Sequence, residues 1–157
     1  MPPIIRLATR DDVDGVIALI GRVFAEYGWI YDPATEVPDL LAFDEHYVAP
    51  AGAFWVLVEA GRVAGSIGVD RRGPEVAELH RLYLDPDRRG QGLGAALIAL
   101  VLDWCDRQGI KRLELWTDTR FVHAHRLYER LGFERDGVRT LVGDINGSRE
   151  FHYERDV

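Results

Sequence analysis

The chain has almost no cysteine and no long apolar segment, and each absence excludes whole classes of protein. Cys105 is the only cysteine among 157 residues, so no disulfide can form within the chain and a multi-cysteine metal site is excluded. The longest apolar run, residues 95–102, is far shorter than the roughly 20 residues that span a bilayer. Residues 1–7 lack the charged and then apolar order of a signal peptide. We therefore expect a soluble protein of the reducing cytoplasm, with no membrane partner.

Basic residues are also fewer than acidic ones. The chain has 19 Lys and Arg against 26 Asp and Glu, a net charge of −7, which argues against nonspecific binding to nucleic acid or anionic lipid. The same excess of acid favours cationic partners. Hydrophobic residues make up 47% of the sequence, which argues against disorder, and the length fits a single domain over residues 1–157.

Hydrophobic periodicity predicts strands and helices that intersperse along the chain. Thr9, with Asp12 three residues later, has the pattern of a capping box, and apolar residues then recur at helical spacing to about Tyr27. From Leu93 onward, apolar residues recur at every fourth position until a stop at Gly109. The mixture predicts an α/β sandwich around one sheet. The expected strands are residues 4–7, 54–59, 63–69, 76–84, 111–117, 138–142 and 149–157, the last two flanking a turn at Asn146-Gly147, and the other expected helices are an irregular one over residues 40–47 and one over residues 122–131.

A glycine-rich loop precedes the clearest of these helices, in the segment DPDRRGQGLGAALIAL at residues 85–100. Glycine loses more backbone entropy on folding than any other residue, so Gly90, Gly92 and Gly94 indicate a backbone shape or a close approach that a Cβ would prevent. The unpaired N–H groups of such a loop and the positive end of the helix dipole together suit an anion such as phosphate.

The residues around the glycines exclude two common kinds of phosphate-binding loop. Arg88 and Arg89 add positive charge beside the loop. A P-loop is excluded because it needs Gly-Lys-Ser/Thr after the glycines. A dinucleotide fingerprint is excluded because its third glycine would fall at position 97, where the chain has Leu97.

The segment RGQGLG, residues 89–94, resembles the Arg/Gln-x-x-Gly-x-Gly/Ala signature of the GNAT family of N-acetyltransferases. Upstream, the strand AELHRLYLDP at residues 77–86 ends in the Asp-Pro turn that usually precedes this loop in the family. Downstream, AHRLYERLGF at residues 124–133 is similar to the family's second cofactor helix, so the resemblance covers essentially the whole chain. It implies a three-layer αβα sandwich around a mixed, mostly antiparallel sheet, of the acyl-CoA N-acyltransferase-like type. It also implies an enzyme that moves an acetyl group from acetyl-CoA (coenzyme A) to an amine by direct attack in a ternary complex.

The resemblance implies roles for side chains near the acyl group. Glu78 matches the glutamate that serves several members of the family as general base, and Tyr128 matches the tyrosine whose hydroxyl points at the thioester sulfur. His80 lies two residues after Glu78, so strand periodicity places both on one face, within range for His80 to relay a proton or hold a water. Other interpretations remain open: Glu78 as a carboxylate that orders a neighbour or binds the substrate's cation, His80 as a structural or solvated histidine, and Tyr128 as a core tyrosine.

The resemblance also implies which residues hold the cofactor. In the family the loop amides and the N-terminus of the next helix cradle the pyrophosphate, and the end of the preceding strand offers backbone groups to the pantetheine arm. Phe121 departs from the pattern, because it stands three residues before Ala124, where an asparagine is often found; apolar contact is expected in its place. The expected cofactor-binding residues are Leu82, Tyr83, Leu84, Arg89, Gly90, Gln91, Gly92, Leu93, Gly94, Ala95 and Phe121.

The amine acceptor is the least determined part of the prediction. The segment GWIYDPATEVP at residues 28–38 is rich in aromatics and acids, which suits a surface that faces the substrate, and Tyr27, Trp29 and Tyr31 are the candidate acceptor-binding residues. The alternative is a loop whose aromatics simply pack on the sheet. The acceptor is a small molecule or a protein amino group, and the oligomeric state, a homodimer included, is left open.

Metal chemistry and a noncatalytic function are the remaining alternatives. His123, His125 and His152 have no partners at metal-ligand spacing in the sequence, so no metal is predicted. Cys105 falls on the apolar stripe of its helix and is expected in the core. A noncatalytic domain that binds or senses acyl-CoA would keep the loop without the chemistry, and the presence of both Glu78 and Tyr128 counts against it.

Overall fold

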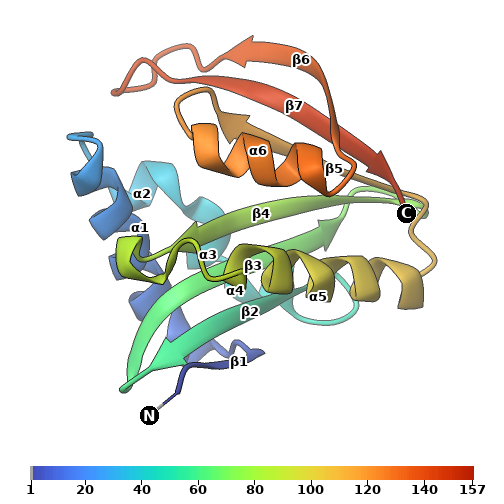
Figure 1. Ribbon diagram of the computed structural model, residues 1–157, viewed down its shortest axis with the longest axis horizontal. Helices are drawn as coiled ribbons and strands as arrows, with labels where there is room; N and C mark the ends of the chain where they lie inside the picture. The colour runs from blue at the N-terminus through green and yellow to red at the C-terminus, as the bar shows by residue number, and fades with distance from the viewer. Residues whose placement is uncertain (1) are drawn as a thin grey trace.

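The computed structural model describes residues 2–157, which form one seven-stranded sheet with helices on both faces (Figure 1). The strand order is β1-β2-β3-β4-β5-β7-β6, and within these residues only β4 and β5 pair in parallel. The fold class expected from the sequence is therefore confirmed. The strands are β1 (Ile4–Leu7), β2 (Gly52–Glu59), β3 (Arg62–Arg71), β4 (Val76–Leu84), β5 (Arg112–Asp118), β6 (Glu134–Thr140) and β7 (Arg149–Asp156).

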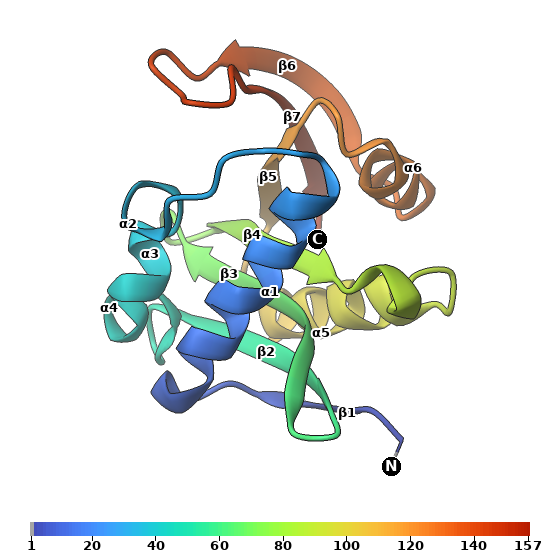
Figure 2. The ribbon, with the colours of Figure 1, turned by 90° about the vertical axis from the view of Figure 1, so that its left-hand side faces the viewer.

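Two apolar cores hold the helices on the sheet. On one face, Leu97 and Val101 of α5 pack with Ile67 of β3 in a buried cluster that α6 extends. On the other face, Leu19 of α1 packs with Phe54 of β2, together with α3 and α4. Figure 2 separates α3 and α4 on one side of the sheet from α5 and α6 on the other. The helices are α1 (Val13–Glu26), α2 (Pro33–Glu36), α3 (Pro38–Leu41), α4 (Phe43–Tyr47), α5 (Leu93–Arg107) and α6 (Val122–Arg130), with short 3₁₀ turns η1 (Arg10–Asp12) and η2 (Pro86–Arg88).

The predicted elements differ from the structure at three places, one of which is the short helix α2 within the segment at residues 28–38 that was expected to be a loop. The expected helix over residues 40–47 is two short helices, α3 and α4, because Ala42 between them leaves the helical conformation with φ −111° and ψ 45°. A strand is present where residues 138–142 were expected to form one, but its bounds are different: β6 begins at Glu134, after the turn at Gly132 with φ +89°, and ends at Thr140. All of β6 is exposed, so it has no alternation of buried and exposed positions from which its bounds could be predicted.

The parallel strands β4 and β5 separate partway along their length. Their pairing runs from Val76 with Arg112 to Glu78 with Glu114 and then stops. Beyond that point β4 continues to Leu84 paired only with β3, and β5 continues to Asp118 paired only with β7. One edge of each strand therefore leaves backbone N–H and C=O groups facing the gap without a strand partner.

A bulge in β4 lies on the part of the strand that borders this gap. The β3–β4 register shifts between Ser66 and Gly68, and opposite them Arg81 has a φ of +54°, a conformation that costs a non-glycine residue on the order of 1 kcal/mol or more. Three contacts hold it: Ser66 Oγ donates to the Arg81 carbonyl at 2.7 Å, and the Arg81 guanidinium donates to Asp39 at 2.6 Å and to the Glu36 carbonyl at 2.8 Å. The bulge is thus maintained by its surroundings rather than by local preference.

Candidate active site

The glycine loop presents unused main-chain N–H groups at the start of α5. Gly90 and Gly92 have φ of +73° and +77°, which explains glycine at both positions, and a Cβ on either would meet no atom within 4 Å. The first amide that donates within α5 is that of Ala96, to the Gly92 carbonyl at 3.1 Å. The N–H groups of Leu93, Gly94 and Ala95 precede it and are free of the helix ladder. Unused N–H groups at a helix N-terminus are of the kind that bind anions.

The third glycine has a different role from the first two. A Cβ on Gly94 would lie 2.9 Å from Leu127 Cδ2 of α6, so the missing side chain lets the N-terminal turn of α5 approach α6. This contact brings together the two helices that the sequence links to the cofactor.

The two loop arginines are paired with carboxylates, a pairing that the sequence does not reveal. Arg89 donates to Glu26 at 2.6 and 3.0 Å and to the Leu84 carbonyl at 3.0 Å, whereas Arg88 forms an ion pair with Glu59. Their positive charge is therefore compensated within the fold, and it is not the free charge expected beside the loop. The arginines anchor the loop, and the main chain and helix dipole supply most of its attraction for an anion.

The preceding Asp-Pro turn is anchored as well. Asp85 is buried, and its carboxylate accepts hydrogen bonds from Arg22 at 2.9 and 3.2 Å and from Arg62 at 3.1 Å. This network ties the end of β4 to α1 and β3, so the glycine loop starts from a fixed point.

Glu78 and His80 lie together on the sheet face opposite α5. Their neighbours Ala77 and Leu79 belong to the core under α5, so strand alternation turns Glu78 and His80 to the other side. His80 Nδ1 lies 3.2 Å from Glu78 Oε2, as the sequence spacing predicts. Burial raises the pKa of the Glu78 carboxyl above its usual value, although the nearby His80 and Arg72 reduce the effect.

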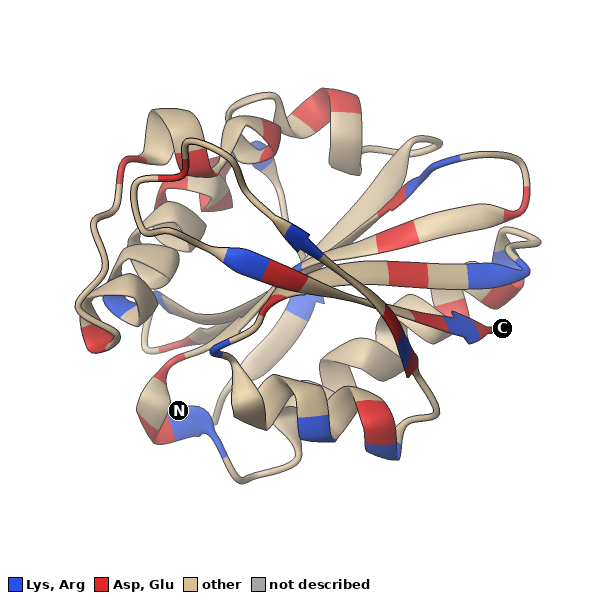
Figure 3. Ribbon diagram, turned by 90° about the horizontal axis from the view of Figure 1, so that it is seen from above, with Lys and Arg blue, Asp and Glu red and all other residues tan. Residues whose placement is uncertain are grey.

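The register places further carboxylates beside Glu78. Asp70 of β3, Glu78 of β4, Glu114 of β5 and Glu154 of β7 are successive cross-strand partners and so share one face. Figure 3 shows the resulting acidic bands on neighbouring strands. The like charges of Asp70 and Glu114 add to the effect of burial on the Glu78 pKa.

Tyr128 lies on the opposite side of the gap from Glu78. It is 4% exposed in the core under α5 and α6, with its ring centroid 5.6 Å from that of Phe133 and 5.8 Å from that of Tyr153. Burial raises the pKa of its phenol, so at neutral pH the hydroxyl keeps its proton. Glu78 and Tyr128 thus lie on different faces of the sheet, near the place where β4 and β5 separate.

An aromatic cluster covers the other end of the gap. Phe121, at the start of α6, lies with its ring centroid 5.3 Å from that of Tyr27, 5.4 Å from that of Trp29 and 6.2 Å from that of Tyr83. Tyr31 instead packs against α1 and donates its hydroxyl to the Ile17 carbonyl at 2.9 Å. Of the three candidate acceptor residues, Tyr27 and Trp29 therefore belong to the cluster around Phe121, whereas Tyr31 packs against Phe24 of α1.

Several residues that contact the aromatic cluster could not be predicted from the sequence. Arg120 forms a two-point ion pair with Asp118 and places its guanidinium 4.0 Å from the Trp29 ring centroid. Asn146, in the β6–β7 turn, exchanges two hydrogen bonds of 2.8 Å with the backbone of Ile30. The turn is thereby joined to the loop that follows α1, although the two are far apart in the sequence.

The structure also gives His152 partners that the sequence does not show. One potential ligand atom from each of Asp136, His152 and Glu154 lies within 4.8 Å of the others. The His152 ring is already engaged by Asp136 at one nitrogen and lies 3.6 Å from Glu114 at the other. Sequence spacing misses this group because a bulge in β6 brings Asp136 to His152.

Comparisons with known proteins agree with these features. The model of the acetyltransferase (GNAT) family matches residues 21–133. The chain is 34% identical over 137 residues to the uncharacterized N-acetyltransferase YjgM of Escherichia coli, covering 84% of this chain and 82% of that protein. It is 30% identical over 159 residues to N-alpha-acetyltransferase RimI of Mycobacterium tuberculosis, covering 99% and 93%. Its structure matches a GNAT acetyltransferase from Staphylococcus aureus Mu50 with a TM-score of 0.85 at 22% identity, over 99% of each chain.

A mixed sheet that opens between two parallel strands, beside a glycine loop at a helix N-terminus, defines an acyl-CoA N-acyltransferase-like fold. The chain belongs to the GNAT family of acetyltransferases. It is accordingly an N-acetyltransferase, and its relatives give no support to a noncatalytic binding domain. Within residues 2–157, no helix has both the length and the hydropathy needed to cross a membrane.

Proposed function

We propose that this N-acetyltransferase uses acetyl-CoA, with its diphosphate on the glycine loop and its acyl arm in the gap between β4 and β5. The main observation that supports this proposal is the set of free main-chain N–H groups of residues 93–95, at the N-terminus of α5 and next to the gap. Backbone groups of Leu82, Tyr83 and Leu84 on the open edge of β4 suit the amide-bearing arm, and Phe121 offers it an apolar contact. When bound, acetyl-CoA supplies the acetyl group as an activated thioester.

Glu78 prepares the acceptor amine for attack. A lysine-like amine has a pKa of about 10.4, so presenting its neutral form at pH 7 costs roughly 4.6 kcal/mol. A carboxylate whose pKa is raised by burial binds the amine's proton more strongly than an exposed one does. Glu78 therefore accepts the proton, directly or through a water. His80, in contact with Glu78, helps to hold that proton.

Tyr128 assists the leaving thiolate with its buried hydroxyl. A thiol pKa of about 8.5 already makes a tolerable leaving group, so Tyr128→Phe should slow turnover by about tenfold and leave it measurable. The rate of thiol release at saturating acetyl-CoA measures this effect. Tyr153→Phe is the matched control, since it removes a hydroxyl from the same core, where it donates to Glu129 at 2.6 Å. Equal turnover in Tyr128→Phe and the wild type would remove Tyr128 from the mechanism.

The acceptor is an amine that enters beside Tyr27 and Trp29. Their stacked rings, 4.5 Å apart between centroids, form an aromatic surface of the kind that attracts a cation. Acceptor panels should include small amines and peptides with a free α-amino group, because one relative is an N-alpha-acetyltransferase. We place the enzyme in the cytoplasm, where reducing conditions suit the free thiol of the buried Cys105.

Thermal unfolding with and without acetyl-CoA tests the cofactor assignment. At a hundred times its dissociation constant, acetyl-CoA should stabilise the fold by about 2.7 kcal/mol, which raises Tm by several degrees for a chain of this size. Acetyl-CoA and CoA should both produce the shift, whereas adenosine without the diphosphate should not. An unchanged Tm at millimolar acetyl-CoA would overturn the proposal.

A further inference from the structure

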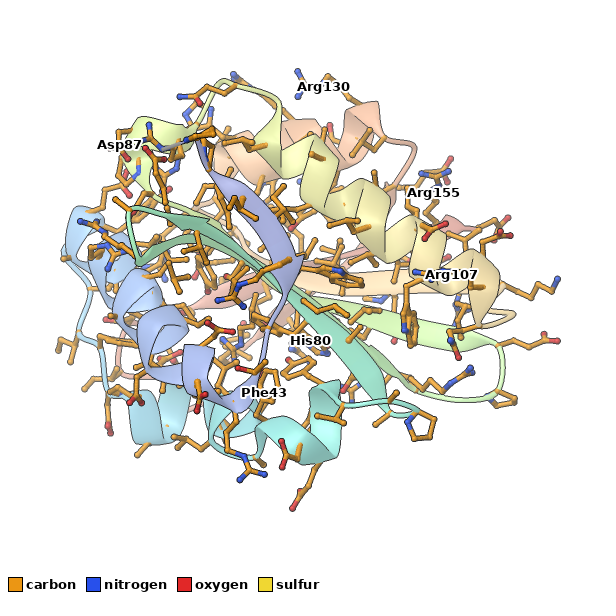
Figure 4. All side chains as sticks on the ribbon, turned by 90° about the horizontal axis from the view of Figure 1, so that it is seen from below. Phe43, His80, Asp87, Arg107, Arg130 and Arg155 are labelled. Carbon is orange, nitrogen blue, oxygen red and sulfur yellow. The ribbon has the colours of Figure 1, made fainter. Side chains whose placement is uncertain are left out.

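Asp70 is a buried carboxylate that directly contacts the His80 side chain. It lies near the end of β3, opposite Glu78 in the register, with its side chain 7% exposed. Its Oδ1 lies 2.8 Å from His80 Nε2, and His80 Nδ1 in turn lies 3.2 Å from Glu78 Oε2. Asp70, His80 and Glu78 therefore form a continuous chain of contacts across two strands. Figure 4 labels His80 and Phe43 on the face that α4 covers.

The charge of Asp70 decides which nitrogen of His80 carries a proton. Burial alone would raise the pKa of Asp70, but its contacts with His80 and Arg72 outweigh burial and hold the pKa below its usual value. An ionised carboxylate only accepts hydrogen bonds, so the 2.8 Å contact requires a proton on Nε2. Arg72 Nη2 is also 3.2 Å from Nε2, but it could donate there only if Nε2 carried no proton, and the contact with the ionised Asp70 carboxylate is the shorter one. Arg72 Nε lies 3.2 Å from the same Asp70 oxygen and pairs with it.

With Nε2 protonated, the lone pair of neutral His80 is on Nδ1, the atom that faces Glu78. We infer that Asp70 is a positioning residue for the base: it fixes the His80 tautomer so that Glu78 can pass on the proton it accepts. This inference rests on the proposed function, because it assigns Glu78 as the base.

The proton can be followed through each step. An N–H bond of the acceptor ammonium breaks and an O–H bond forms on Glu78, while the electron pair stays on nitrogen and forms the C–N bond to the acetyl carbonyl carbon. The C–S bond of the thioester breaks, and the second proton that nitrogen loses as the amide forms leaves with the thiolate as free thiol. The O–H bond on Glu78 then breaks as an N–H bond forms on His80 Nδ1, which restores the carboxylate. The negative charge of Asp70 compensates the positive charge of the resulting His80 imidazolium. The Nδ1 proton of His80 returns to solvent after the products leave. The charged and titratable groups that surround His80 are His46 and Tyr47 of α4, Asp39 of α3, Asp70 of β3, Arg72 just after β3, and Glu78 of β4.

A double-mutant cycle separates this role from a structural one. Asp70→Asn permits the wrong tautomer, and His80→Gln keeps a donor for Asp70 but has no basic nitrogen that can take up the proton from Glu78. Each single variant should lower kcat/KM for the amine by about 10- to 100-fold, within the usual range for general acid–base catalysis, without changing KM for acetyl-CoA. The double variant should be no worse than His80→Gln alone, because Asp70 acts through His80. Additive losses would overturn the inference.

The pH profile gives a second readout that a structural defect would not move. The charge of Asp70 helps to raise the pKa of Glu78, so Asp70→Asn should move the acid limb of kcat/KM to lower pH. Asp103→Asn is the matched control: Asp103 also pairs with an arginine, at 3.0 Å, but on the exposed surface of α5. Its profile should equal that of the wild type. If the acid limb of kcat/KM in Asp70→Asn lay at the same pH as in the wild type, the role of Asp70 as a positioning residue would be contradicted.

Nitrogen-15 NMR of the histidine rings tests the geometry without any acceptor. Neutral His80 should carry its proton on Nε2 in the wild type and lose that preference in Asp70→Asn. Protonation on Nδ1 in the wild type would overturn the inference. Failure of the proposed function looks different, since acetyl-CoA would then release no thiol with any amine while the Nε2 tautomer persisted.

Discussion

Glu78→Gln is expected to lower kcat/KM for the amine acceptor by about 100- to 1,000-fold, or roughly 2.7 to 4.1 kcal/mol of transition-state stabilisation. Glutamine has nearly the same shape as glutamate but cannot accept a proton from an ammonium group. Acetyl-CoA binding should not change, because the glycine loop lies at the other end of β4. Thiol release against acceptor concentration measures the first effect, and the acetyl-CoA-dependent Tm measures the second.

The pH dependence distinguishes loss of a base from a general disturbance. Because burial raises the pKa of Glu78, the wild-type rate should fall on acidification at a higher pH than for an exposed carboxylate. Glu78→Gln should lack this acid limb. Glu75→Gln, the same change at an exposed position just before β4, should keep both the rate and the limb. If Glu78→Gln retained wild-type kcat/KM, Glu78 would be a structural carboxylate.

Stability should not account for the loss in Glu78→Gln. A carboxyl whose pKa is higher in the folded than in the unfolded chain binds its proton more tightly when folded. Its contribution to the free energy of unfolding then decreases as pH rises through that window, so ionised Glu78 opposes folding at pH 7. Replacing it with neutral glutamine should leave Tm at pH 7 unchanged or raised.

The sequence predicts best the features that short stretches of backbone determine. The strand at 76–84 agrees with β4 at both ends, and the glycines at 90 and 92 do adopt positive φ. Glu78 and His80 share a face because strand alternation alone requires it. Each of these features depends on residues a few positions apart, so one sequence contains the information.

Features that depend on register could not be predicted in this way. Asp70 reaches His80 only because β3 pairs with β4 in one register, and nothing near Asp70 in the sequence indicates it. The ion pair between Arg89 and Glu26 joins residues 63 positions apart. The bulge at Arg81 is similar, since Asp39 and Ser66 from two other elements hold it. Tertiary contacts decide such features, and local propensity does not encode them.

The pairing of both loop arginines changes which residue is the informative one to mutate for cofactor binding. Replacing Arg89 would release Glu26 and the Leu84 carbonyl, so a loss of binding would not separate charge from disorder of the loop. Gly92 is the better position, because it caps α5 in a left-handed conformation and open space surrounds it.

Gly92→Asp is expected to abolish nearly all of the roughly 2.7 kcal/mol of stabilisation that a hundredfold excess of acetyl-CoA provides. Aspartate tolerates positive φ better than most residues, and its charge at a helix N-terminus is favourable, so the apo fold should lose no more than about 1 kcal/mol. The same carboxylate would lie at the proposed diphosphate site and would repel the diphosphate. Tm measured with and without acetyl-CoA gives both quantities from one protein sample.

Gly109→Asp is the control at the other end of the same helix. Gly109 has φ +71° against +77° for Gly92, and a Cβ at either position meets no atom within 4 Å. Without acetyl-CoA, Gly109→Asp should be destabilised more than Gly92→Asp, because an acidic residue near a helix C-terminus interacts unfavourably with the helix dipole. The response of Gly109→Asp to acetyl-CoA should nevertheless be complete, since the proposed diphosphate site lies at the N-terminus of α5. Equal loss of the response in both variants would show that damage to α5, and not the loop at residues 89–95, governs binding. A full response in Gly92→Asp would place the diphosphate away from this loop.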